Sequence, residues 1–279
     1  MSSSDTDLMM ALCGSHRERV RALRDALDHC RGNNGEPAVH ALRLAARHLQ
    51  PLLDIQKRLS PGDEKARRLR KAVRRIIDLT NDLRDLQTHV LRLAAMPGKG
   101  ELRRALLDMA AKEEARQRRR VGRKLERIVV KPGKFRCEAL RTKAVRAAMK
   151  ATCEASRARM QRRIARLDDQ DPAGLHRVRV AVKRHRYLLV VLDMQAAREQ
   201  RTLAASLERM QHRLGDWHDA RMFAERLQAA AASLAPRQRA RCVKLAREES
   251  TAAQAMQRRL IAQLRHERPT RQSHRAHGH

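Results

Sequence analysis

The segment 172–192, PAGLHRVRVAVKRHRYLLVVL, decides how the rest of the chain folds. Placed on an α-helix at about 100° per residue, it separates into two faces. One face is an apolar arc of roughly 120°, which we expect to pack against neighbouring helices; it contains Leu175, Val178, Ala181, Val182, Leu189 and Leu192. The other face carries one basic side chain on each successive turn, namely His176, Arg179, Lys183 and Arg186.

A second segment repeats this pattern. The sequence PAVHALRLAARHLQPLL, which begins at Pro37, places His40, Arg43, Arg47 and Gln50 on the corresponding arc. A constant offset of 136 residues relates the first three of these to His176, Arg179 and Lys183, and NDLRD at 81–85 aligns with GDWHD at 215–219 at an offset of 134. Two motifs in the same order at nearly one offset predict that a four-helix unit is duplicated. Pro51 is expected to kink or end its helix.

The composition is typical of a protein built from long helices. Ala, Leu and Arg dominate, and the chain has only 1% aromatic residues. We predict an all-α fold of eight long helices, arranged as two four-helix bundles with a basic groove between them. The expected helices cover about 7–31, 64–95, 101–129, 137–168, 172–192, 197–232 and 236–266, and one more begins near Pro37. The bundles span 7–130 and 136–267 of a single domain, 7–267, and the tails 1–6 and 268–279 are expected to be disordered.

The formal net charge of +32 points to polyanionic partners. Magnitudes of about 2–8 are usual for a small soluble domain. The five cysteines are widely spaced and form no CxxC motif, so neither a metal site nor a disulfide framework is predicted, and a reducing cytoplasm is the simpler setting. The N-terminus has no basic region before its short apolar run, and no apolar run reaches spanning length, so neither secretion nor membrane insertion is expected.

Four motifs together resemble the CHAD family (conserved histidine α-helical domain). These are VHALRLAARHL at 39–49, NDLRDLQTHVLRL at 81–93, LHRVRVAVKRHRYLL at 175–189 and LERMQHRLGDWHDARMFAERL at 207–227. They occur in the family's order, and the resemblance covers about residues 7–266. It implies two four-helix bundles related by a pseudo-twofold axis, a basic groove between them, and binding of inorganic polyphosphate. In bacteria such proteins are associated with polyphosphate granules.

The resemblance also implies which residues contact polyphosphate. The implied contacts are His40, Arg43, Arg47, Arg84, His176, Arg179, Lys183, Arg184, Arg186 and His218. Further basic residues that we predict to contribute are Arg21, His48, Arg119, Arg120, Arg123 and Arg157.

The sequence departs from the family pattern at several positions. His48 and Gln50 stand where the family usually has Arg, so weaker binding by the first half is expected. Pro51 is expected to distort the helix close to its basic row. His185 replaces the usual Leu in the apolar arc, and we interpret it as a core histidine with its hydrogen bonds satisfied.

A basic row suits a polymer that offers a charge at every phosphate. Side chains three or four residues apart on a helix lie about 5–6 Å apart at Cβ, and Arg adds bidentate contacts to phosphate oxygens. His40 and His176 fall in the first turns of their helices, where the helix dipole favours an anion over imidazolium. Polyphosphate and protons should therefore bind together, with higher affinity at pH 6 than at pH 8. The alternative interpretation of one basic row is a solvated helix face. Asp85 and Asp219 are interpreted as carboxylates that orient basic neighbours.

Three classes of function are compatible with these features. The preferred one is a non-enzymatic polyphosphate-binding protein without metal or cofactor, cytoplasmic and associated with granules. The alternative is sequence-independent binding of nucleic acid, although side chains for base stacking are scarce. An enzyme acting on polyphosphate is disfavoured because no phosphate-cradling glycine loop, paired-carboxylate site or activated nucleophile is visible. The sequence leaves open the chain-length preference, the oligomeric state and protein partners.

Overall fold

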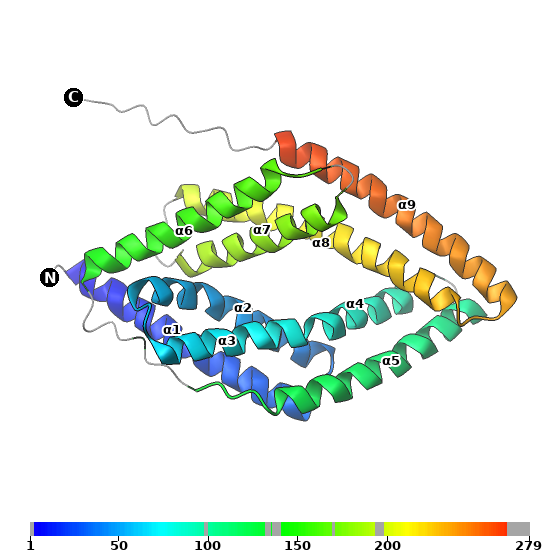
Figure 1. Ribbon diagram of the computed structural model, residues 1–279, viewed down its shortest axis with the longest axis horizontal. Coiled ribbons are helices and arrows are strands. Elements are labelled where there is room, and N and C mark those ends of the chain that lie inside the picture. The colour runs from blue at the N-terminus through cyan, green and yellow to red at the C-terminus, as the bar shows by residue number, and fades with distance from the viewer. Residues whose placement is uncertain are drawn as a thin grey trace.

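The computed structural model describes residues 3–97, 100–131, 135, 141–168, 171–192 and 198–266, and all the regular structure in them is helical (Figure 1). The all-α prediction is therefore confirmed. The helices run in the order α1 Ser3–Gly32, α2 Glu36–Leu59, α3 Glu64–Leu79, α4 Asn81–Ala95, α5 Glu101–Leu125, α6 Thr142–Ala165, α7 Pro172–Leu192, α8 Arg198–Ala231 and α9 Pro236–His266. No helix within these ranges is long and apolar enough to cross a membrane.

Helix boundaries differ from the sequence prediction at four places. Helix α1 begins at Ser3, so residues 3–6 are helical and not part of a disordered tail. Helix α2 does not end at Pro51 but continues to Leu59, while α5 and α6 are shorter than predicted. The predicted tail 268–279 lies outside the described residues.

The predicted helix 64–95 is divided at Thr80. Arg43 of α2 donates to the Ile77 carbonyl at 3.0 Å and to Thr80 Oγ1 at 2.9 Å, and it reaches Asn81 Oδ1 at 2.8 Å. In an uninterrupted helix the Ile77 carbonyl would accept from the amide of Asn81. A side chain from another helix thus takes over an intrahelical acceptor, which separates α3 from α4 by one residue.

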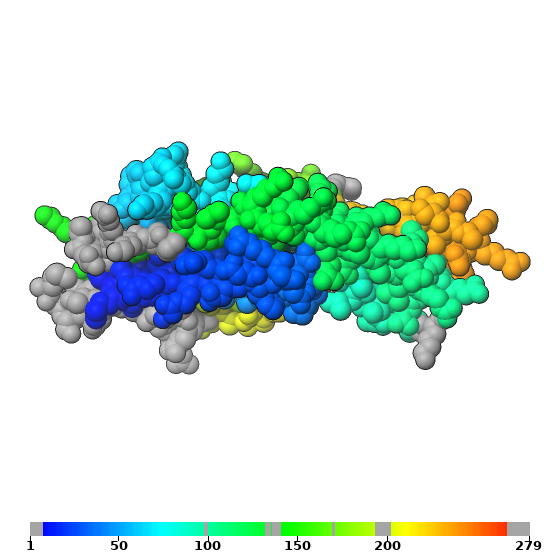
Figure 2. Space-filling view, turned by 90° about the horizontal axis from the view of Figure 1, so that it is seen from below, coloured from blue at the N-terminus to red at the C-terminus, as the bar shows by residue number. Residues whose placement is uncertain are grey.

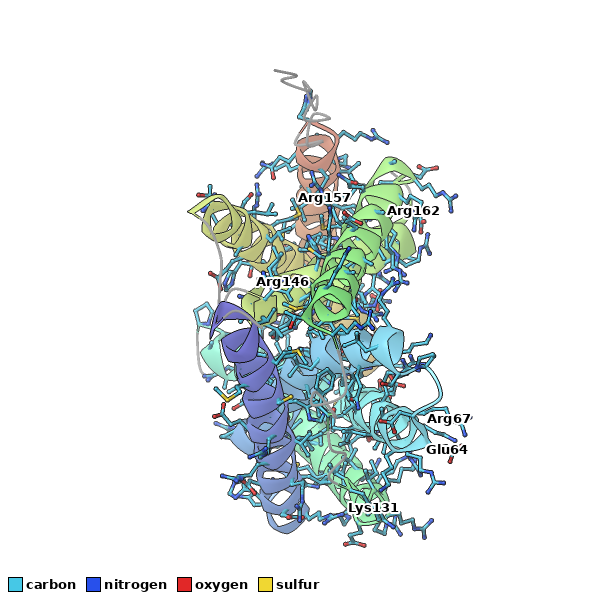
Figure 3. All side chains as sticks on the ribbon, turned by 90° about the vertical axis from the view of Figure 1, so that its left-hand side faces the viewer. Glu64, Arg67, Lys131, Arg146, Arg157 and Arg162 are labelled. Atoms are coloured by element: carbon cyan, nitrogen blue, oxygen red, sulfur yellow. The ribbon has the colours of Figure 1, made fainter. Side chains whose placement is uncertain are left out.

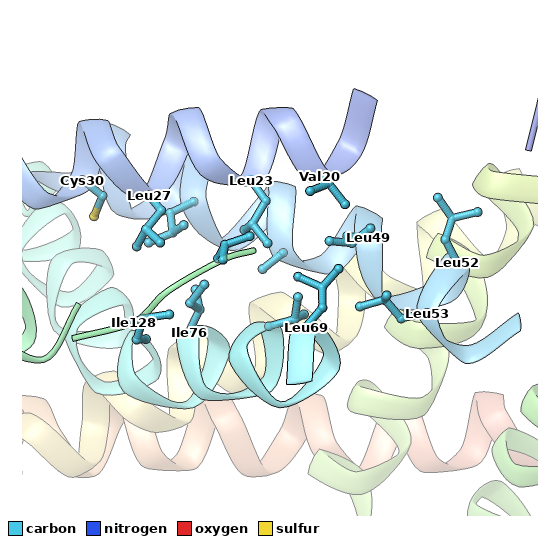
Figure 4. Close-up of a cluster of buried hydrophobic side chains, with 14 of the residues drawn as sticks. Val20, Leu23, Leu27, Cys30, Leu49, Leu52, Leu53, Leu69, Ile76 and Ile128 are labelled. Atoms are coloured by element: carbon cyan, nitrogen blue, oxygen red, sulfur yellow. The ribbon is translucent and has the colours of Figure 1, made fainter. Parts of the chain in front are cut away.

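Helices α1, α2 and α3 enclose the largest cluster of buried apolar side chains (Figure 4). Leu23 and Leu27 of α1 meet Leu49 of α2 and Ile76 of α3, and Ile128 closes the cluster from the segment that follows α5. A second cluster joins α6, α7, α8 and α9 around Trp217. The first cluster also includes Val145 of α6 and Val191 of α7, so it reaches into the second part of the chain, and internal duplication stays a prediction.

A third cluster connects the two parts at the far end of the elongated molecule (Figures 1 and 2). Leu93 of α4 and Leu106 of α5 pack there against Phe223 and Leu227 of α8, with Cys242 of α9. Nearer the middle, Ile55 of α2 packs against Leu188 of α7 and Ala148 of α6. The region between these apolar joints is where α2, α4, α7 and α8 bring polar side chains together.

The cysteine prediction needs a correction. Cys30, Cys153 and Cys242 have free thiols, but Cys13 is disulfide-bonded to a partner outside the described residues. The expectation that the chain forms no disulfide is therefore wrong. Cysteine spacing alone cannot show which cysteines a fold brings within bonding distance.

We expect Leu93→Ala to lower the free energy of unfolding by about 2–5 kcal/mol, because it creates a cavity in the cluster that joins α4 and α5 to α8 and α9. Leu93 is fully buried, whereas Leu91, two residues earlier on α4, is 53% exposed. Leu91→Ala is therefore the matched control, with an expected change within about 0.5 kcal/mol. Urea denaturation followed by circular dichroism measures both. Equal losses in the two variants would contradict the packing described here.

Candidate anion-binding site

Helix α2 packs against α7 near the centre of the molecule, and α4 and α8 flank this crossing (Figure 1). The two basic rows predicted from sequence meet here. We use the name central cluster for Arg43, Arg47, Arg179 and Lys183 together with Asp85 of α4 and Asp219 of α8. Residues 136 positions apart in the sequence thus become spatial neighbours.

Lys183 carries the clearest sign of crowded positive charge. Burial lowers its pKa to about 6, and the charges of the three cluster arginines and of Arg186 act in the same direction. Removing an ammonium group from water favours its neutral form, and nearby cations add to this effect. Lys183 is therefore largely neutral at pH 7 while no anion is bound.

Arg179 and Lys183 are without direct partners. Neither side chain makes a hydrogen bond or salt bridge to any residue that the structure describes, although both are half-buried. Burial also lowers the pKa of Arg179, and only the charges of Asp219 and Asp85 oppose that shift. Buried cations are normally paired. These two residues are therefore the ones best able to contact an added anion.

Arg43 plays a different part from its counterpart Arg179. It is 6% exposed, and its guanidinium is hydrogen-bonded at the junction of α3 and α4. Burial lowers its pKa to about 9, with Arg47 adding to the shift, so the guanidinium stays charged at neutral pH. Arg43 contributes positive charge to the cluster, while most of its donors serve the fold.

Tyr187 links the two rows at the crossing. The Arg47 guanidinium lies beside the Tyr187 hydroxyl; burial lowers the pKa of Arg47, and the tyrosine partly offsets this. The His48 ring packs edge-on against the Tyr187 ring at 5.1 Å between centroids. His48 therefore borders the cluster next to Arg47, and burial together with Arg19 and Arg186 lowers its pKa.

Asp85 and Asp219 supply the negative charge at the cluster. His218 Nε2 lies 3.9 Å from Asp85 Oδ2, which fits the interpretation of this aspartate as an orienting carboxylate. Burial opposes ionisation of Asp85, but contact with His218 and the charge of Arg43 outweigh it and lower the pKa. Burial instead raises the pKa of Asp219, in spite of Arg179.

The histidines lie around the cluster. The His176 ring is 5.3 Å from the His218 ring, centroid to centroid, and burial followed by the charges of His218 and Arg179 lowers the pKa of His176. His40 is exposed on α2, where burial and the charges of Arg84, Lys183 and Arg47 lower its pKa. Both residues therefore favour the neutral form, as the prediction of proton-linked binding requires.

Three predicted site residues are held in ion pairs. Arg84 is paired with Glu36, and Arg184 is 2.6 Å from Asp54. Arg186 is 2.7 Å from Glu208 and 2.9 Å from Gln211 of α8. The ten predicted contact residues therefore differ in how free they are to bind an anion, because these three are already paired with carboxylates. Arg184 in particular contacts Asp54, which is not part of the central cluster.

The remaining predicted residues lie on outer surfaces. Arg21 is exposed on α1, and Arg119, Arg120 and Arg123 are exposed on α5. Arg157 is exposed on α6, where Figure 3 shows it among the basic side chains of that helix. None of these five residues contributes to the pKa shifts of the cluster cations.

His185 is buried as predicted, but its hydrogen bonds are not all satisfied. It is 1% exposed, and its Nδ1 atom has no hydrogen-bond partner within the described residues. Burial lowers its pKa to about 4. It is therefore a neutral core residue and not part of the cationic row.

Comparison with known proteins agrees with the predicted resemblance. The sequence model of the CHAD domain family matches residues 17–228, which is most of the chain. The chain belongs to the CHAD domain family. The crystal structure of the CHAD domain from the plant Ricinus communis is similar, with 19% identity, 93% of this chain and 90% of that chain covered, and a TM-score of 0.67.

A second solved structure shares the fold of this CHAD protein. PptA from Streptomyces chartreusis is 16% identical, with 93% of this chain and 99% of that chain covered and a TM-score of 0.63. At these identities the two structures establish the fold alone. No curated protein matches the chain.

We expect Lys183→Met to stabilise the ligand-free protein. Between pH 6 and 10.5 the unfolded chain holds a proton that Lys183 has lost in the folded state, so the stability of the wild type rises with pH in this range. Methionine removes that dependence. The variant should be more stable than the wild type by more than about 1.4 kcal/mol at pH 6.5, which is the equivalent of one pKa unit, and the margin should shrink toward pH 9.

Urea denaturation of both proteins at the two pH values measures this margin. Lys71→Met provides a control, since Lys71 is exposed on α3. A margin that is the same at pH 6.5 and pH 9, or that matches the control, would show that Lys183 does not titrate as described.

Proposed function

We propose that this CHAD protein binds inorganic polyphosphate at the central cluster, without catalysis. Membership of the family supports this proposal, because the sequence motifs imply polyphosphate binding. The observation that carries it is the pair of half-buried basic side chains, Arg179 and Lys183, that have no direct partner among the described residues.

An anion changes the energy balance of this cluster. Four basic side chains face two carboxylates, and burial lowers the pKa of every one of the four. A phosphate oxygen beside Lys183 would stabilise its ammonium form and accept charge-assisted hydrogen bonds from Arg179. A polymer with a charge at each phosphate can meet the rows of α2 and α7 together.

Nucleic acid is the second candidate, because a formal net charge of +32 attracts any polyanion. Side chains for base stacking are scarce at the cluster, where Tyr187 is the aromatic neighbour and is itself 7% exposed. A phosphate polymer without bases therefore fits this site better than nucleic acid. We extend the proposal to association with polyphosphate granules, where such a polymer is concentrated.

We expect Arg179→Ala/Lys183→Ala to weaken binding of long-chain polyphosphate at least tenfold at near-physiological salt. Each lost charge-assisted hydrogen bond contributes about 1.5–3 kcal/mol before solvent screening. Arg241→Gln/Lys244→Gln, which removes the same charge from the exposed face of α9, should change the affinity less than twofold. Isothermal titration with double-stranded DNA as competitor gives both values.

The competitor also separates the two candidate functions. Polyphosphate that remains bound in the presence of excess DNA supports the proposal. Equal competition by DNA, together with equal losses in the cluster variant and the α9 control, would show that polyanions bind to a diffuse basic surface and not to the central cluster.

We further expect binding to take up a proton. Polyphosphate should raise the pKa of Lys183 from about 6, so the affinity should increase as the pH falls from 8 toward 6, by up to about tenfold per pH unit. Titrations in buffers of different ionisation enthalpy report the proton uptake directly. Lys183→Met should reduce both the proton uptake and the pH slope. An unchanged slope in this variant would assign the effect to the histidines instead.

A further inference from the structure

A separate basic pocket lies between α2, α6 and α7. Its volume is about 310 Å³, and its lining includes Lys57 and Arg58 of α2, Arg159 and Ser156 of α6, and Arg184 of α7. It shares no lining residue with the central cluster. The family resemblance implies Arg184 as a polyphosphate contact, and the structure places it in this pocket.

The charge of this pocket is poorly balanced. Asp54 contributes a carboxylate, and it is paired with Arg184 at 2.6 Å. The other three cations, Lys57, Arg58 and Arg159, are exposed and make no ion pair within the described residues. An anion that enters the pocket would therefore meet three cations that no carboxylate in the described structure neutralises.

Positive charge also surrounds the rim. The pKa of Arg163, on the same helix as Arg159, is lowered by burial and then by the charges of Arg159, Arg177 and Arg184. Such a field raises the local concentration of anions. Arg184 and Arg159 can each present two parallel N–H donors, which match phosphate oxygens.

The size and lining of the pocket restrict the ligand. Small-molecule sites usually have volumes of about 300–1,000 Å³, so this one is at the lower end. Its lining contains no aromatic side chain, and its apolar surface comes from Pro51, Ala155 and Leu188. A nucleotide base would find no stacking partner among these residues. A compact anion with several charges fits better than a nucleotide.

We propose that this pocket is a second phosphate site, which binds a short chain of two or three phosphoryl groups independently of the central cluster. The ligand is either a free oligophosphate or the end of a longer polymer. This site goes beyond the proposed polymer binding, because its occupancy does not require Arg179 or Lys183.

Tripolyphosphate is the probe, measured by isothermal titration with the full chain. The wild type should bind one equivalent at the pocket, and Lys57→Gln/Arg159→Gln should weaken that binding at least tenfold. Both side chains are exposed, so the variant should fold. The α9 variant Arg241→Gln/Lys244→Gln removes equal charge and should stay within twofold.

A gain of affinity provides a second test. Asp54→Asn removes the pocket carboxylate and releases Arg184, so tripolyphosphate should bind more tightly. An affinity that is unchanged or lower in Asp54→Asn would overturn the assignment of Arg184 to the site. Equal binding by the wild type and Lys57→Gln/Arg159→Gln, or an equal loss in the α9 control, would overturn the pocket itself.

Titration with long-chain polyphosphate separates this inference from the proposed function. If Arg179→Ala/Lys183→Ala binds the polymer like the wild type, the central site fails while the tripolyphosphate result still decides the pocket. Displacement of tripolyphosphate in proportion to polymer chain ends would identify a chain end as the occupant. Absence of displacement would identify free short chains; both outcomes support a second site.

Discussion

Crowding of like charges where α2 crosses α7 is the constraint on which the rest of this structure depends. Burial lowers the pKa values of Lys183, Arg47 and Arg179, and the charges of the two arginines lower the pKa of Lys183 further. Such an arrangement opposes folding. The apolar clusters on both sides, one around Leu23 and Leu49 and the other around Trp217, supply the burial that offsets it.

The apolar cluster that joins α4 and α5 to α8 and α9 helps to position the carboxylates of the central cluster. Leu93 and Phe223 lie in one buried cluster, so α4 and α8 are held together beyond the cluster of charges. Asp85 of α4 and Asp219 of α8 are thereby fixed next to Arg179. The charges of the two carboxylates offset part of the positive charge of the cluster without neutralising all of it. Rigid helices that hold an incomplete set of counter-ions keep a site ready for an external anion.

The sequence was sufficient to predict the all-α fold and the family, because both depend on local periodicity and on motif order. It also placed His176, Arg179 and Lys183 on one face, since that follows from spacing along a single helix. It could not separate Arg43 from Arg179, which occupy equivalent positions in the two motifs. Their difference arises from Thr80 and Asn81 on another helix, which take the donors of Arg43.

Partners across helices explain the other differences. Arg184 and Arg186 follow Lys183 closely in the sequence, yet Asp54 holds one and Glu208 the other. The pocket beside Asp54 was missed for the same reason, because its lining comes from three helices. The one signal available was that Asp54 and Arg58 continue the face of α2 that carries Arg47, at intervals of seven and four residues.

The identity of residue 183 shows how a buried cluster of cations can be tolerated before its ligand arrives. A guanidinium keeps its charge even where burial lowers its pKa, as Arg43 does at about 9. An ammonium group can lose its proton, and Lys183, with a pKa of about 6, does so at neutral pH. One lysine among three arginines therefore reduces the repulsion in the free protein. Because an anion restores the missing charge, the same residue would contribute its full attraction only when the ligand is present.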